Sequence, residues 1–292
     1  MTETKRRPLL VLVDAMNVFY RAFYAIPRLT RSDGMPTNAL MGFIKSVDSF
    51  VKNWQPTHLA VILEGGIPEE RLALLPEYKA QRPPTPPDLK IQLPALQEYL
   101  DASKTSTITV GDEEADDVMA SLAVSSKNEA DVIIFSGDKD MLQMVDANIS
   151  VVSPSATTEK IDADSVFNKT GVRPDQIVDW LALTGDSADN IQGVPGVGVK
   201  TAAKWLNEFG TFENIVANKT DLKPPRLAEV LSEHIETVLR NRQMVRLRTL
   251  SASDLDWHDF ELYGAVPDEL IQFFQKYELR SIARSYQEQT LF

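Results

Sequence analysis

Cysteine is absent from this chain of 292 residues, and histidine occurs only three times. Disulfide bonds are therefore excluded, and zinc or haem sites lack almost all of their usual ligands. No apolar run is long enough to cross a membrane. The run that follows the basic N-terminus, Leu9–Val13, is too short for a signal peptide and indicates a buried strand. We therefore expect a protein of a reducing cytoplasm with no membrane partner.

Positive charge is also scarce, because 30 Lys and Arg face 42 Asp and Glu, for a net charge of −12. Such a deficit argues against nucleic-acid binding unless the negative charge is concentrated in one place and offset there. Nine of the acids do fall into five clusters along the chain: Asp14; Glu64; Glu114, Asp116 and Asp117; Asp138 and Asp140; Asp186 and Asp189. The remaining surface is then freer to carry local basic patches.

A fold that gathers these carboxylates must neutralise them, because like charges raise each other's pKa and burial of a charge is costly. Ligand sets made only of oxygen favour Mg²⁺, with Mn²⁺ as a substitute. Two such cations can orient a water and stabilise the oxygens of a phosphate under attack. Within one cluster, Glu114 and Asp117 are one helical turn apart and are expected to reach one cation, while Asp116 approaches a second.

The hydrophobic pattern predicts an α/β protein. Leu9–Val13 and Leu59–Leu63 read as buried parallel strands, and a helix that begins near Thr37 separates them. Further strands are predicted at 105–110, 131–135 and 149–152, with helices beginning near Glu114 and Lys139. Parallel strands place their carboxyl ends at one edge of a sheet, where Asp14, Glu64, Glu114 and Asp138 would meet. Residues 65–100 are rich in proline and predict a mobile, partly helical excursion above that edge.

From about residue 160 the chain becomes helical, and it contains a glycine-rich segment after Asp189. Gly193, Gly196 and Gly198 would let the backbone approach a phosphate, which the next helix would meet with its N-terminal N–H groups. Lys200, Thr201 and Lys204 follow on that helix. A plain surface turn is the alternative, but the position after the last acid cluster favours phosphate binding.

Seven segments resemble one protein family: LVDAMNVFYRAF, SDGMPTNALMGF, PEYKAQRPPTP, EEADDVMASLA, SGDKDMLQMV, LALTGDSADNIQGVPGVGVKTA and FFQKYELRS. Together they are similar to the 5′ nuclease domain of bacterial DNA polymerase I and its stand-alone relatives in the flap endonuclease superfamily. The resemblance implies a PIN-like domain at 1–160 with a mostly parallel central sheet and an arch at about 65–100. A helical region at 161–292 would follow, with a helix–three-turn–helix DNA-binding motif at about 176–212 and C-terminal segments packed back on the first domain.

The resemblance also implies an activity, namely a Mg²⁺-dependent 5′→3′ exonuclease and 5′-flap endonuclease of replication and repair. Its expected substrates are DNA with 5′ ends or flaps, and RNA primers paired to DNA. All nine acids match the family's metal site. Lys79, Arg82 and Asp116 match catalytic positions, and Tyr20, Arg21, Arg71, Tyr78 and the glycine-loop residues match DNA contacts. A monomer of the bacterial cytoplasm or nucleoid is expected, with K⁺ at the loop and a DNA polymerase or ligase as partner.

Two departures from the family pattern keep an alternative open. Glu64 stands where an Asp is usual, and Glu69 with Glu70 places negative charge on the expected path of the 5′ strand. A DNA-binding protein of the same fold with weakened catalysis is therefore the second hypothesis. A small-molecule phosphatase is opposed because no second Asp follows Asp14 in the pattern of an aspartyl nucleophile. The arginines at 240, 242, 246 and 248 are predicted to coat a solvated helix, with contact to duplex phosphates as the alternative.

Overall fold

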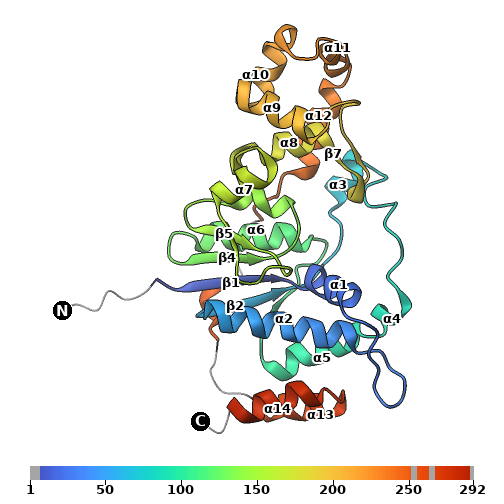
Figure 1. Ribbon diagram of the computed structural model, residues 1–292, viewed down its shortest axis with the longest axis vertical. Coiled ribbons are helices and arrows are strands. Elements are labelled where there is room, and N and C mark those ends of the chain that lie inside the picture. Colours follow the sequence, from blue (N-terminus) through green and yellow to red (C-terminus); the bar gives the residue numbers. More distant parts are fainter. Residues whose placement is uncertain (1–6, 251–254, 263–266, 290–292) are drawn as a thin grey trace, which may run out of the picture.

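The fold is known from a computed structural model that describes residues 7–250, 255–262 and 267–289. Within them lies a six-stranded sheet in the order β3-β2-β1-β4-β5-β6. Its strands are β1 (Leu9–Asp14), β2 (His58–Ile62), β3 (Ser106–Ile108), β4 (Asp131–Phe135), β5 (Ile149–Val152) and β6 (Lys160–Ile161). Among these six strands, only β6 pairs antiparallel, with β5. The predicted α/β class with a mostly parallel central sheet is confirmed (Figure 1).

Both faces of the sheet are covered, which explains why β1 is an almost unbroken apolar run. Val11 and Val13 point into one core, together with residues of α1 (Ala15–Ala25), α2 (Asn38–Trp54) and α5 (Leu93–Ser103). Leu10 and Leu12 point into the other core, with residues of α6 (Ala115–Ser126) and of the helical region. The two-residue alternation of a strand thus divides β1 between two cores.

The C-terminal helices α13 (Asp268–Lys276) and α14 (Arg280–Gln289) lie against the α2 and α5 side of the sheet (Figure 1). Phe273 and Phe274 are buried in the same core as Phe43 and Tyr99. The last described segment therefore packs on the sheet domain. The expected division of the chain at about residue 160 stays a prediction.

Residues 65–92 form an excursion along one side of the molecule, which we call the arch segment. It contains α3 (Glu69–Leu74) and α4 (Pro87–Lys90), with turns and a proline-rich stretch between them (Figure 1). Its middle touches the helical region: the Lys79 N–H donates to the Asp189 carbonyl at 3.2 Å, and Asn190 Nδ2 donates to the Glu77 carbonyl at 2.9 Å. The partly helical excursion of the sequence prediction is present, and it is fastened at its centre.

The helical region stands at one end of the sheet (Figure 1). Its elements are α7 (Ala163–Thr170), η2 (Pro174–Gln176), α8 (Ile177–Thr184), the hairpin of β7 (Gly185–Asp186) and β8 (Ile191–Gln192) around η3 (Ser187–Asp189), α9 (Val199–Phe209), α10 (Phe212–Ala217), η4 (Lys219–Asp221), α11 (Arg226–Glu233) and α12 (Ile235–Val245). The short helix η5 (Trp257–Phe260) lies instead against the sheet, where Trp257 packs on His58 of β2 and the Ser106 hydroxyl of β3 donates to the Asp259 carbonyl. The helix predicted near Lys139 is a short 3₁₀ helix, η1 (Asp140–Met144). None of the helices in the described ranges is long and apolar enough to span a membrane.

Candidate functional site

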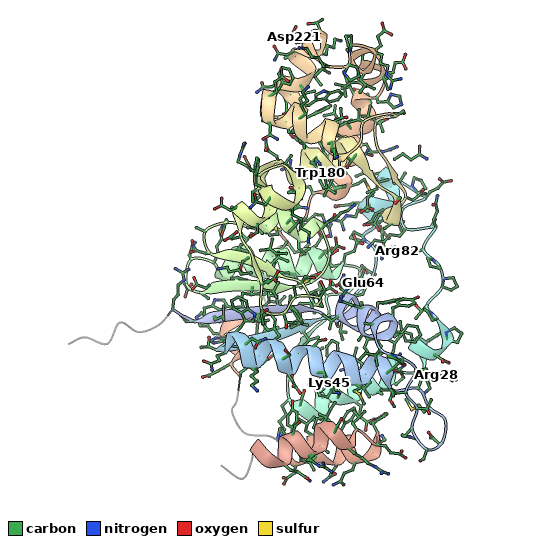
Figure 2. All side chains as sticks on the ribbon, in the orientation of Figure 1. Arg28, Lys45, Glu64, Arg82, Trp180 and Asp221 are labelled. Atoms are coloured by element: carbon green, nitrogen blue, oxygen red, sulfur yellow. The ribbon has the colours of Figure 1, made fainter. Side chains whose placement is uncertain are left out.

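The acid clusters converge at the carboxyl edge of the sheet. Asp14 is the last residue of β1, Glu64 follows β2, Glu114 precedes α6, and Asp138 follows β4. A cleft of about 680 Å³ opens at this edge. Four of the nine acids line it, namely Asp14, Glu64, Asp116 and Asp138, together with the predicted site residues Tyr20, Arg21, Lys79 and Arg82. Figure 2 shows Glu64 beside the sheet edge and Arg82 on the arch segment above it.

Asp14 is fixed by the local chain path from β1 into α1. Its Oδ1 accepts the Asn17 N–H at 2.9 Å, which caps α1, and its Oδ2 accepts the Ser136 hydroxyl at 2.7 Å. Burial raises the pKa of Asp14 to about 6, repulsion from Asp138 and Glu64 adds to the rise, and the two hydrogen bonds oppose it. The carboxylate is therefore held in place although its charge is disfavoured.

Three other carboxylates in the cluster are disfavoured in the same way. Burial raises the pKa of Asp116, and the negative charges of Asp14 and Asp138 raise it further. Burial likewise raises the pKa values of Asp138 and Asp140, with Asp186 among the repelling neighbours of both. The Oδ1 atom of Asp140 is buried and has no hydrogen-bond partner among the described residues. Close carboxylates that repel each other are an environment that a divalent cation relieves.

The fit of this donor set to a metal is chemical rather than geometric. All candidate ligands are carboxylate oxygens, which suit Mg²⁺ or Mn²⁺. Across the described part of the chain, however, no three acidic or histidine side chains are already arranged to hold a metal ion. The carboxylates interact through space but would need side-chain adjustment to share a cation.

Basic residues of the arch segment partly neutralise the acids. Lys79 Nζ contacts Glu114, and Arg82 Nη2 contacts Asp189 Oδ1 at 2.5 Å. The Tyr78 hydroxyl, itself buried, donates toward Glu114 and Asp189, with oxygen–oxygen distances of 3.2 Å to each. Tyr78, expected to contact DNA directly, thus lies beneath the cleft surface and joins the arch segment to two acids.

Arg71 also lies in the interior, with 5% of its surface exposed. It forms an ion pair with Glu114, and its Nη2 lies 3.0 Å from Asp117 Oδ1. Glu114 and Asp117 are 1% and 0% exposed. The structure differs from two expectations here: Arg71 is buried and does not line the cleft, and what Glu114 and Asp117 share is a buried guanidinium. Interior ion pairs of this kind satisfy charges that could not stay unpaired out of water.

The departure at Glu64 has a local explanation. Its Oε2 accepts from the Ala115 N–H at 3.4 Å, so the longer side chain reaches the N-terminus of α6 while it still lines the cleft. A carboxylate at this end also suits the helix dipole. The extra methylene therefore connects β2 to the helix that carries Asp116.

The glycine loop after β8 uses its three glycines for different reasons. A Cβ on Gly193 would lie 2.2 Å from the Thr184 carbonyl carbon, so this glycine lets the hairpin close on α8. Gly196 has a φ of +81°, which glycine adopts without strain. Gly198 is the N-cap of α9 and a Cβ there would meet nothing within 4 Å. The exposed side chains of Lys200 and Lys204, with partly buried Thr201, follow on the first turns of α9.

Sequence reasoning missed several residues that support the site. Ser136 and Asn17 donate hydrogen bonds to Asp14, and both lie inside motifs in which only the acids were predicted to belong to the site. Lys139 Nζ lies 3.3 Å from Asp186 Oδ1. The arginines expected to coat a solvated helix include Arg242, which pairs with Asp179 at 2.8 Å, and Arg248, which pairs with Asp117 at 3.2 Å. No local pattern marks these long-range partners.

A parallel α/β sheet with clustered carboxylates at its carboxyl edge, a basic segment across them and a glycine loop beyond defines the class: a nuclease hydrolase. The chain belongs to the 5′-3′ exonuclease family. Residues 9–171 match its N-terminal resolvase-like domain, and residues 172–268 match its C-terminal SAM fold.

Similar curated proteins include the 5′-3′ exonuclease of Aquifex aeolicus, which is 35% identical over 278 residues, 94% of each chain. The DNA polymerase I proteins of Bacillus caldotenax and Bacillus subtilis are both 35% identical over 93% and 94% of this chain. The chain spans about a third of the length of these polymerases, 32% and 31%.

Solved structures with the same fold include the flap endonuclease D15 of bacteriophage T5 in a complex with DNA and metal ions. It is 24% identical, with a TM-score of 0.68 over 94% of this chain and 99% of that one. The catalytic core of Rad2 with a DNA substrate is 16% identical, with a TM-score of 0.60 over 93% and 88% of the two chains. At these identities, the likeness establishes the fold.

Proposed function

We propose that this protein is a Mg²⁺-dependent 5′→3′ exonuclease and 5′-flap endonuclease that hydrolyses phosphodiesters of DNA. The observation that carries the proposal is the convergence of Asp14, Asp116, Asp138 and Asp140 at one sheet edge, where burial and repulsion from neighbouring carboxylates raise all four pKa values. The T5 flap endonuclease and the Rad2 core were solved with DNA, and the T5 5′-exonuclease was solved with bound divalent metal ions.

The proposed holders of two Mg²⁺ ions, or of Mn²⁺ as a substitute, are the acids nearest the cleft and the acids of the β7–β8 hairpin: Asp14, Glu64, Asp116, Asp138, Asp140, Asp186 and Asp189. Glu114 would join them once Lys79 leaves it. Asp117 would support the site without binding a metal ion itself, because Arg71 and Arg248 already donate hydrogen bonds to both its oxygens. When bound, the metal ions supply an activated water and charge stabilisation at the phosphate.

The chain's own residues supply position and charge. Ser136 and Asn17 hold Asp14 in a fixed orientation. Lys79 and Arg82 would exchange their carboxylate partners for the phosphate of the bound strand, while Tyr20 and Arg21 line the cleft beside it. The free N–H groups at the start of α9, with Lys200 and Lys204, would grip the adjoining duplex, with K⁺ proposed at the same loop.

The proposed substrates are DNA with 5′ ends or flaps, and RNA primers paired to DNA. The proposed setting is a monomer in a bacterial cytoplasm, working beside a DNA polymerase or ligase. The deciding experiment incubates the purified protein with a labelled 5′-flap duplex in Mg²⁺, in Ca²⁺ and in EDTA. We expect cleavage in Mg²⁺ alone, with 5′-phosphate and 3′-hydroxyl ends. Absence of cleavage in both Mg²⁺ and Mn²⁺ would refute the proposed activity.

A second candidate function is a flap- or duplex-binding protein with weakened catalysis. It is favoured by the contacts of Lys79 and Arg82 with Glu114 and Asp189, because both cations of the cleft are already paired with carboxylates. Such a protein would bind the flap in Ca²⁺ as tightly as a nuclease but would turn over negligibly in Mg²⁺. Glu64→Asp would then restore cleavage if the longer carboxylate is the cause.

A further inference from the structure

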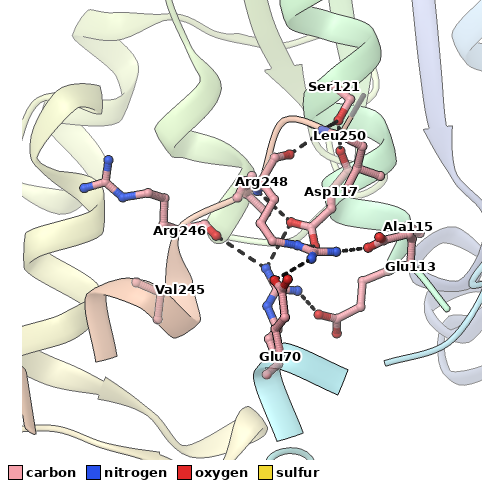
Figure 3. Close-up of polar contacts among 12 residues, drawn as sticks. Glu70, Glu113, Ala115, Asp117, Ser121, Val245, Arg246, Arg248 and Leu250 are labelled. Atoms are coloured by element: carbon pink, nitrogen blue, oxygen red, sulfur yellow. Dashed lines mark hydrogen bonds and ion pairs between the residues drawn. The ribbon is translucent and has the colours of Figure 1, made fainter. Parts of the chain in front are cut away.

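One arginine outside the cleft connects three separate parts of the fold. After α12 the chain runs as residues 246–250 between α3 of the arch segment and α6 (Figure 3). The segment is fastened to α6 and η1 by its backbone: Leu250 N–H donates to Ser121 Oγ at 2.8 Å, and Leu247 N–H donates to Gln143 Oε1 at 3.0 Å. Arg248 is therefore placed with little freedom.

Arg248 makes four polar contacts with three acids. Its backbone N–H donates to Asp117 Oδ1 at 2.8 Å, and its Nε lies 3.2 Å from Asp117 Oδ2. Its Nη1 lies 3.1 Å from Glu70 Oε2 on α3, and its Nη2 pairs with Glu113 just before α6 (Figure 3). We call these residues with Arg71 the Arg248 cluster: Glu70, Arg71, Glu113, Asp117 and Arg248.

Asp117 is the centre of this cluster and has no exposed surface. Burial raises its pKa, and the positive charge of Arg71 is the largest influence in the opposite direction. Arg71 uses its other nitrogen for Glu114, which in turn contacts Lys79. A continuous line of charge pairs thus runs from Arg248 through Asp117, Arg71 and Glu114 to a proposed catalytic lysine.

Glu70 has a different role in this arrangement from the one that the sequence suggested. The sequence suggested that it would repel a 5′ strand, but its carboxylate pairs with Arg248. Its side chain is otherwise 79% exposed, so the pair itself contributes little energy. Its value is geometric, because it ties the first helix of the arch segment to the segment that holds the acid helix.

We propose that Arg248 is a positioning residue of the active centre, an inference that rests on the proposed nuclease function. Arg248 satisfies one side of Asp117, so that Arg71 is free to hold Glu114 and the base of the arch segment at the same time. Without Arg248, the buried Asp117 would draw Arg71 wholly to itself, because a buried charge that loses its partner is strongly destabilising. Glu114 and the arch segment would then shift, while the distant duplex-gripping loop would stay as it is.

The first test compares Arg248→Gln and Arg248→Lys, with Arg246→Gln as the matched control. The Arg246 side chain lies two residues away and points out of the cluster, whereas its backbone carbonyl, which accepts from Arg71, is kept (Figure 3). We expect Arg248→Gln to lower kcat on a 5′-flap in Mg²⁺ by about tenfold to a hundredfold, as loss of a supporting partner does at metal sites. KM, and the flap Kd in Ca²⁺, should change by less than about threefold since the duplex grip lies elsewhere.

Arg248→Lys should recover part of the lost kcat, because lysine keeps the charge but lacks the fork that reaches three acids. If Arg248→Gln fails to fold, the kcat of Arg248→Lys tests the proposal in its place. An unchanged kcat in both variants, or an equal loss in Arg246→Gln, would overturn the proposal.

A second readout does not depend on cleavage. Urea unfolding of wild type, Asp117→Asn, Arg248→Gln and the double variant gives the coupling between the two residues. We expect the double variant to be more stable than Arg248→Gln alone, since the buried charge has gone, with a coupling of about tenfold or more in the unfolding constant. Additive effects would refute the charge network even if wild type cuts flaps. If wild type does not cut, the nuclease proposal fails, and the cycle still tests the network.

Discussion

The acid cluster at the sheet edge and the glycine loop after β8 are two ends of one proposed site, yet they are built by opposite means. The loop is set by backbone packing: Gly193 closes on Thr184, and buried Asn241 donates to the carbonyls of Ala182 and Gln192 at 3.1 and 2.7 Å. The acid cluster consists of side chains that repel each other and are partly neutralised by ion pairs with cations such as Arg82. If the proposed function holds, the loop would receive a phosphate without rearrangement, whereas acids such as Glu114 and Asp189 would first exchange their cationic partners.

The largest effect should come from Asp116→Asn, which removes one negative charge from the centre of the acid cluster and keeps its shape. We expect kcat for flap cleavage in Mg²⁺ to fall by roughly 10³-fold or more, because several kcal/mol of transition-state stabilisation depend on the metal ligands. The flap Kd in Ca²⁺ should stay within about threefold, since phosphate contacts supply most of the affinity for a duplex and the proposed contacts lie on the glycine loop.

The matched control is Asp164→Asn on α7, which removes one exposed charge from a position that does not line the cleft. It should cleave like wild type in the same assay. Undiminished cleavage by Asp116→Asn would contradict the proposed site, and an equal loss in both variants would point to a general charge effect.

The next largest effect concerns the loop, where Gly193→Ala and Gly198→Ala form a pair. A Cβ at Gly193 would collide with the Thr184 backbone, so we expect a loss of about 1–3 kcal/mol in the free energy of unfolding, together with weaker duplex binding. A Cβ at Gly198 meets no atom within 4 Å, so its free energy of unfolding should change by less than about 0.5 kcal/mol.

The Gly198 variant should nevertheless bind duplex more weakly, because the new methyl group stands where the backbone is expected to approach a phosphate. Chemical unfolding and duplex titration in Ca²⁺ measure the two quantities separately. Equal stability losses in the two variants would show that the loop is not preorganised in the way described.

The largely buried carboxylate of Asp48, which does not line the cleft, can be compared with the acids of the cleft. Asp48 on α2 accepts the Tyr286 hydroxyl at 2.5 Å, and burial raises its pKa to about 6 from an ordinary value of 3.8, with that hydrogen bond opposing the rise. The folded state binds this proton more tightly than the unfolded state does. The free energy of unfolding must therefore fall as the pH rises from about 4 to about 6, and this loss persists above pH 6.

Asp48→Asn removes that loss and keeps an oxygen for Tyr286. We expect the variant to be more stable than wild type by about 1–3 kcal/mol at pH 7.5 and nearly equal to it at pH 4. Urea titrations at the two pH values measure the difference. Unlike the acids of the cleft, Asp48 should show no change in this behaviour when Mg²⁺ is added, and a Mg²⁺-dependent difference would contradict the separation of the two environments.

The smallest effects should come from the exposed lysines of α9. Lys200→Gln and Lys204→Gln should each weaken duplex binding only a few fold, and each should reduce the slope of log Kd against log salt by about one. Titrations at several salt concentrations measure that slope. Lys90→Gln on α4 is a control that lies outside the loop. An unchanged slope in both α9 variants would place the duplex on another surface.

Much of the architecture could be predicted from the sequence because it depends on short-range patterns. Apolar runs such as Leu9–Val13 mark strands that are covered on both faces, and an Asp directly after a strand marks the carboxyl edge of a parallel sheet. The partners of Arg71 and Arg248 could not be predicted in this way. Arg71 and Asp117 are 46 positions apart, and Arg248 and Asp117 are 131 positions apart. No helical or strand period connects such residues.

The sequence by itself determined the α/β order, the family, and the residue types that meet at the sheet edge, because each of these is written in local hydrophobic period and motif spacing. Only the tertiary structure decided which carboxylates face the cleft and which lie behind it. Asp116 lines the cleft, whereas its neighbour Asp117 is fully buried between two arginines. The physical reason is that adjacent positions on a helix point about 100° apart, and what each one meets depends on segments far away in the chain.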